Sequence, residues 1–71
     1  MPVIVGITLK NKNYIDFKIS SEDPLKDLAI SNGVVNIGDF SKDINDVLEI
    51  NFWDDDPFNT TGKYLGGLKF Y

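Results

Sequence analysis

The sequence has no cysteine, no histidine and no arginine. Without cysteine there is no disulfide, and without cysteine or histidine there is none of the usual zinc sites. The Ser-His and Cys-His pairs that activate most protein nucleophiles cannot form either. A Ser-Lys or paired-carboxylate mechanism remains formally open, but 71 residues leave little room for a pocket that buries a substrate. We therefore expect a protein that is not an enzyme.

All seven basic residues are lysine, against eleven acidic residues, so the formal net charge is −4. The imbalance is local: residues 41–60 carry six acids and only Lys42, a net −5, whereas the rest of the chain is close to neutral. Because no guanidinium fork and no basic stripe is available, we expect no nucleic-acid partner. The acidic segment favours a cation or a basic protein surface, or it simply keeps a small protein soluble.

The length predicts a single small β-rich domain over residues 1–71. So short a chain has little core, and without disulfides or a structural metal such domains often depend on oligomerisation or a partner. Gly6 and Thr8 interrupt the apolar run of residues 3–9, so we expect neither a signal peptide nor a membrane span. A cytoplasmic location fits the absence of cysteine.

Alternating apolar residues predict the strands. Val3, Val5, Ile7 and Leu9 share one face, and Ile15, Phe17 and Ile19 alternate with Asp16 and Lys18, so residues 3–20 should form a β-hairpin around Asn11-Lys12-Asn13. Further strands are expected at 34–37, 46–54 and 64–71, with a bulge or a close backbone approach at Gly66-Gly67. The predicted fold is a mostly β protein, a small antiparallel sheet of about five strands arranged as a sandwich or open barrel.

The segment between the hairpin and residue 34 predicts one short helical turn near residues 24–31. Ser21 or Asp23 can cap it, Pro24 suits its first position, and Gly33 can end it as a left-handed cap. An irregular loop is the alternative, because so short a helix needs tertiary packing. The polar segment 39–45 is expected to be a loop.

The strand ending at Phe52 and Trp53 runs directly into Asp54, Asp55 and Asp56. Calcium takes six to eight oxygen ligands, and this turn offers several carboxylates and the Asn59 amide. Asp54, Asp56 and Asn59 are therefore the candidate metal ligands, and calcium is the one cofactor considered. The turn is not an EF-hand, since Phe58 fills a ligand position. The competing interpretation is a solvated acidic turn without any metal.

Residues 48–54, Leu-Glu-Ile-Asn-Phe-Trp-Asp, continue with Asp55-Asp56 and, after the turn, with Gly62-Lys63-Tyr64-Leu65-Gly66. This stretch resembles the late strands and third calcium-binding loop of C2 domains. The resemblance implies that Asp54 and Asp56 are calcium ligands and that Phe58 inserts into a membrane. It covers about 20 of the 71 residues, Lys63 stands where the family often has an acid, and the chain is shorter than an eight-stranded C2 sandwich.

Trp53 and Phe58 carry a second hypothesis. Trp53 falls on the strand face opposite Leu48, Ile50 and Phe52, so an exposed Trp53 beside Phe58 would form an apolar anchor with Asp54, Asp55 and Asp56 at its rim. That composition is typical of a protein–protein hot spot whose charged edge steers a basic partner. The alternative places both aromatics in the core. We expect a non-enzymatic binding module that acts as an inhibitor, an adaptor or a self-assembling subunit, with calcium-dependent membrane or ligand binding as the alternative.

Overall fold

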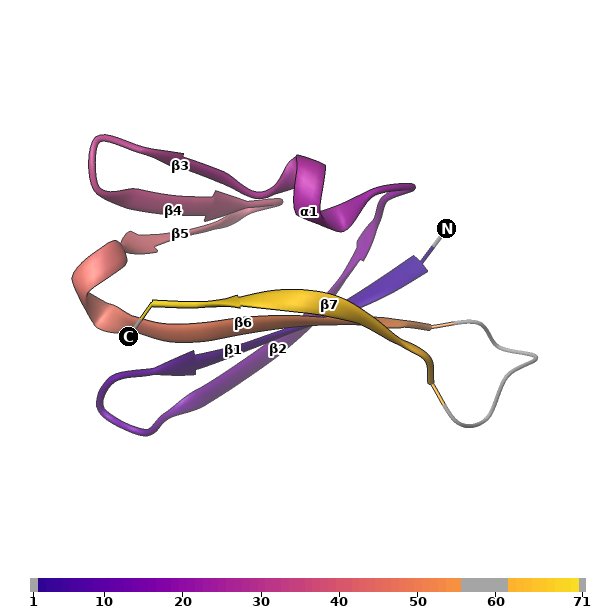
Figure 1. Cartoon of the computed structure of the whole chain (residues 1–71), viewed down its shortest axis with the longest axis horizontal. Helices are drawn as coiled ribbons and strands as arrows, with labels where there is room; N and C mark the ends of the chain where they lie inside the picture. The colour runs from indigo at the N-terminus through magenta and orange to yellow at the C-terminus, as the bar shows by residue number, and fades with distance from the viewer. Residues whose placement is uncertain (1, 56–61, 71) are drawn as a thin grey trace.

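The chain folds into two small antiparallel β-sheets that pack on each other (Figure 1). The computed structural model describes residues 2–55 and 62–70. The larger sheet has the strand order β2-β1-β6-β7 and the smaller one β3-β4-β5. The strands are β1 (Pro2–Leu9), β2 (Tyr14–Ser20), β3 (Ala29–Ser31), β4 (Val34–Ile37), β5 (Phe40–Asp43), β6 (Val47–Asp54) and β7 (Tyr64–Lys69), with a helix α1 (Pro24–Asp27) and a 3-10 turn η1 (Ile44–Asp46). The prediction of a mostly β, antiparallel fold is confirmed, although the described strands number seven rather than about five.

The core lies between the two sheets. Strands β1 and β6 occupy the middle of the larger sheet, so alternate residues of both are fully covered. The buried hydrophobic side chains of this core are Val3, Val5, Ile7 and Leu9 from β1, Val47, Ile50 and Phe52 from β6, and Val35 and Ile37 from β4. Because β4 contributes to the same cluster as β1 and β6, the smaller sheet is joined to the larger one by shared hydrophobic contact.

The predicted β-hairpin over residues 3–20 is confirmed. Its loop closes through hydrogen bonds from Leu9 N–H to the Asn13 carbonyl (2.8 Å) and from Lys12 N–H to the Leu9 carbonyl (2.9 Å). Lys12 adopts the left-handed conformation, with φ of 73°, as a three-residue hairpin loop requires of its last residue. Asparagine tolerates this conformation better than lysine, but the loop length places Lys12, not Asn11 or Asn13, at the left-handed position.

The predicted helical turn is shorter than residues 24–31. Helix α1 covers only Pro24–Asp27, and Asp23 caps it by accepting a hydrogen bond from Lys26 N–H. Residues 29–31 instead form β3, which pairs with β4. Asn32 (φ 53°) and Gly33 (φ 74°) make the two-residue turn of this hairpin, so the prediction that Gly33 caps a helix is wrong.

Two further differences arise from pairing register. Segment 40–43, expected within a loop, forms β5 and pairs with β4. The pairing of β1 with β6 shifts by one residue, since Thr8 pairs with Glu49 but Leu9 pairs with Val47. Leu48 is therefore an extra residue without a partner in the register. Val47 is buried in the core, where simple alternation with Ile50 and Phe52 would have placed Leu48. None of the described helices is long and apolar enough to cross a membrane.

Candidate functional site

The larger sheet has an outer face, turned away from the core, that carries Tyr14, Trp53 and Tyr64. Trp53 lies across from Ile4, and Asn51 across from Gly6, on the side opposite the buried Val5 and Phe52. We call the side chains of Ile4, Tyr14, Asn51, Trp53 and Tyr64 the aromatic face. The sequence predicted that Trp53 lies opposite Leu48, Ile50 and Phe52. The register confirms this for Ile50 and Phe52, whereas Leu48 is the extra residue of the register shift. Trp53 itself is half-buried rather than exposed.

Trp53 and Tyr64 pack directly on each other at the centre of the aromatic face. They are paired residues of β6 and β7, with ring centroids 5.9 Å apart and planes tilted by 60°. The Tyr64 hydroxyl donates a hydrogen bond of 2.8 Å to Oδ1 of Asn51, which lies on β6. Such a tilted pair contributes beyond the area that it buries, and the hydrogen bond fixes the Tyr64 ring. The aromatic pair is therefore held in place although Tyr64 is 54% exposed.

Glycines form the floor under these rings. A Cβ atom on Gly6 would collide with the Tyr14 hydroxyl and the Trp53 ring, so both side chains lie directly over the Gly6 backbone. On β7, a Cβ on Gly67 would collide with the Ile50 carbonyl oxygen and the Asn51 side chain. Close approach of a neighbour is the usual reason for glycine inside a strand. The sequence predicted a bulge or a close approach at Gly66-Gly67. The close approach is confirmed at Gly67, and Gly66 lies beside a register shift between β6 and β7.

Charged residues of both signs border the aromatic face. Glu49 lies between Thr8 of β1 and Lys69 of β7 in the strand register. At another border of the same face, Lys18, which pairs with Ile4, forms an ion pair of 3.0 Å with Asp55. The face is thus an apolar, aromatic centre with a mixed, partly acidic border.

Asp54 and Asp55, the two described residues of the Asp54-Asp55-Asp56 run, have different surroundings. Asp54 lies across from the buried Val3, on the core side, whereas Asp55 reaches Lys18. Asp54 Oδ1 is buried and has no hydrogen-bond partner among the described residues. Within residues 2–55 and 62–70, no group of three acidic side chains is close enough to hold a metal ion. The predicted ligands Asp56 and Asn59 and the predicted anchor Phe58 lie outside the described residues.

Sequence reasoning missed Tyr14 and Tyr64 as parts of the aromatic face. Their side chains are 55% and 54% exposed. The available signal was the position of Tyr14 relative to Asp16 and Lys18, which share its strand face. To place Tyr14 and Tyr64 beside Trp53, one needs the pairing register of all four strands from β2 to β7, and the sequence alone does not give that register.

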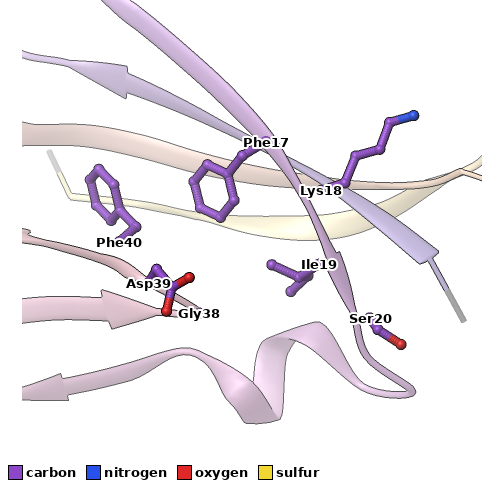
Figure 2. Close-up of a pocket in the computed structure, with 7 residues that line it drawn as sticks. All are labelled: Phe17, Lys18, Ile19, Ser20, Gly38, Asp39 and Phe40. Atoms are coloured by element: carbon purple, nitrogen blue, oxygen red, sulfur yellow. The ribbon is translucent and has the colours of Figure 1, made fainter.

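A groove lies on the other side of β2, between that strand and the β4–β5 turn (Figure 2). It has a volume of about 620 Å³ and is lined by Phe17, Lys18, Ile19, Ser20, Gly38, Asp39 and Phe40. Phe17 and Phe40 stack at its end, with ring centroids 5.9 Å apart and an angle of 21° between the planes. The groove is open, and its lining combines the apolar Phe17, Ile19 and Phe40 with polar residues.

Comparison with known proteins gives no further assignment. No protein family, no curated protein and no solved structure matches this chain. The resemblance of residues 48–66 to C2 domains therefore stays a prediction from the sequence.

Proposed function

We propose that this chain is a non-enzymatic module that binds a protein partner through its aromatic face. The observation that carries the proposal is Trp53, packed on Tyr64 over a glycine floor, on the side of the sheet away from the core. Tryptophan and tyrosine dominate the binding energy of protein interfaces, because each contributes a large, rigid contact area with few rotatable bonds. An inhibitor, an adaptor and a self-assembling subunit would all use such a surface.

The charges around the face indicate what kind of partner fits. Asp16, Glu49 and Asp55 border it, against Lys18 and Lys69, and the whole chain has a formal charge of −4. A complementary, basic protein surface would be attracted to this border, and its association would slow as salt is added. The tyrosine hydroxyls and the Asn51 amide supply polar contacts beside the aromatic centre.

The test combines capture with affinity measurement. A photo-crosslinking side chain at Tyr64 should capture a discrete partner from an extract of the producing cells, whereas the same group at exposed Leu25 should not. With the purified partner, Trp53→Ala should weaken binding roughly 30-fold or more, as for a hot-spot residue. The control Ile30→Ala, at another exposed apolar position, should bind as the wild type does.

Circular dichroism and thermal melting should show that Trp53→Ala remains folded, because the side chain lies outside the core. Equal capture from Tyr64 and Leu25, or equal affinity of the wild type and Trp53→Ala, would contradict the proposal. Unfolding of Trp53→Ala would assign this residue to the stability of the sheet instead.

The alternative function is calcium-dependent binding of a ligand or membrane through the acidic turn. One observation favours it: the buried Asp54 Oδ1 has no partner among the described residues, and a cation would supply one. Millimolar calcium should then raise the melting temperature by mass action, and Asp54→Asn combined with Asp56→Asn should abolish the increase. Asp16→Asn is the control. A wild-type protein whose melting temperature does not respond to calcium would exclude this function.

A further inference from the structure

Strand β2 is the longest open sheet edge in the described part of the chain. It has seven residues, against six in β7, four in β5 and three in β3, the other edge strands. Its pairing with β1 is regular throughout, whereas a register shift interrupts the pairing between β6 and β7. A long, regular edge is a template for another strand, because its outward backbone groups have no strand partner.

The hairpin loop determines which backbone groups of β2 point outward. Leu9 N–H donates to the Asn13 carbonyl, so this pair is hydrogen-bonded. Hydrogen-bonded and non-hydrogen-bonded pairs alternate along an antiparallel ladder. Counting from the Leu9–Asn13 pair, the Val5–Phe17 pair is hydrogen-bonded, so the backbone N–H and carbonyl of Phe17 point toward β1. It follows that Asp16 and Lys18 present their N–H and carbonyl groups to the open edge.

The strand reads Tyr-Ile-Asp-Phe-Lys-Ile-Ser, which is nearly symmetric in character about Phe17. We propose that two copies of this chain dimerise by antiparallel pairing of their β2 strands about a two-fold axis at Phe17. In this register Asp16 lies across from Lys18 of the second copy, and Ile15 lies across from Ile19. Asp16 and Lys18 are also the residues whose backbone groups point outward. The same register therefore pairs opposite charges and allows backbone hydrogen bonds between the two copies.

Charge complementarity selects this register. Charged residues on an edge strand normally oppose pairing with another strand. Here the order Asp16, Phe17, Lys18 places opposite charges across the two-fold axis twice, and a self-complementary patch is what a two-fold dimer requires. Lys18 already contacts Asp55, but its side chain is 70% exposed and its ammonium group has three donors, so it can also bond Asp16 of the second copy.

The groove beside β2 accommodates the apolar side of the same interface. Figure 2 shows Phe17 and Ile19 on the side of β2 that faces Phe40 and Gly38, with Lys18 on the opposite side. Ile15 shares the face of Phe17 and Ile19, yet it is 37% exposed. In the dimer, Ile15 of each copy would lie against Ile19 at the edge of the other copy's groove, which removes exposed apolar surface from water.

The dimer would join two four-stranded sheets into one continuous sheet, with both aromatic faces on the same side. It uses β2 residues rather than Trp53, so it does not depend on the proposed function. A partner with two sites could engage both faces at once and would gain affinity through effective concentration.

Sedimentation equilibrium of the full chain, at concentrations up to about 1 mM, tests the proposal. The wild type should reach twice the 8.0 kDa chain mass. Asp16→Lys and Lys18→Asp each place two like-charged pairs across the axis and should raise the dimer dissociation constant at least about tenfold. The double variant should restore the dimer. Glu22→Lys and Lys42→Asp, which change the charge equally at exposed positions elsewhere, should dimerise normally.

A mixed sample of labelled and unlabelled wild type supplies a second test that needs no variant. An intermolecular Hα–Hα nuclear Overhauser effect should appear at Phe17, because non-bonded antiparallel partners approach most closely. A wild type that remains monomeric overturns the proposal, as does a dimer that lacks this signal, ignores the single reversals or is not restored by the double variant. Trp53→Ala should leave the dimer intact. If this variant is monomeric, the interface lies on the aromatic face and the proposal is overturned as well.

Discussion

Gly6 shows how a single residue without a side chain positions the candidate site. Its φ is not in the left-handed region, so an alanine would fit the backbone of β1. What prevents a larger residue is the space above it, which the Tyr14 hydroxyl and the Trp53 ring occupy. Tyr14 is exposed and its tip can move away, but Trp53 is packed against Tyr64. The fit of the Trp53 ring therefore depends on glycine at this position.

At the residue scale we predict that Gly6→Ala lowers the free energy of unfolding by about 1–3 kcal/mol, because the new methyl group displaces the Trp53 ring. Urea denaturation measures the loss, and a shift in Trp53 fluorescence reports the displacement. In a Trp53→Ala background the same substitution should cost clearly less, since the obstacle is gone. An equal cost in both backgrounds would show that the strain lies in the backbone and not in the aromatic face.

At the scale of elements, sequence reasoning succeeded where alternation was long and failed where strands were short. Residues 3–20 alternate over two complete strands, and the hairpin formed as predicted. Strand β3 has only three residues, and Leu25, Leu28 and Ala29 also fit one helical face. Asn32-Gly33 ends a helix as readily as it turns a hairpin, so local chemistry could not decide between the two. Pairing with β4 decided it.

The same limit applies to the candidate site. The face of Trp53 could be predicted, since it depends only on the alternation within β6. The neighbourhood of Tyr14 and Tyr64 depends on register, and register here includes shifts near Leu48 and between Phe52 and Trp53. A one-residue shift moves every later side chain to the other face. No local pattern reveals such a shift, because it results from which residues fill the core best.

The β3–β4 hairpin offers a prediction at this scale. Gly33 has φ of 74° and no atom within 4 Å of an added Cβ, so a substitution there meets only backbone strain. We expect Gly33→Ala to lower the free energy of unfolding by about 1 kcal/mol. Gly33→Asn should cost less, because asparagine tolerates the left-handed conformation. Thermal melting of the two variants checks the order; equal melting temperatures would contradict the left-handed turn.

At the scale of the whole molecule, the two sheets share one hydrophobic core. Val35 and Ile37 of β4 are fully buried in the same cluster as Val5 and Ile7 of β1 and Phe52 of β6. Neither sheet has a separate buried cluster among the described residues. A small domain built in this way should unfold as one cooperative unit, since loss of β4 would expose the inner face of the larger sheet.

Val35→Ala tests this cooperativity. Removing two buried methyl groups should lower the free energy of unfolding by about 2 kcal/mol. If the sheets unfold together, hydrogen exchange of the slowest amides should lose the same free energy in β1, β6 and β4, although the substitution lies in the smaller sheet. Ile30→Ala, at an exposed position of β3, should change protection little in any strand. Loss of protection confined to β3, β4 and β5 would mean that the smaller sheet opens alone while the aromatic face, carried by the larger sheet, stays assembled.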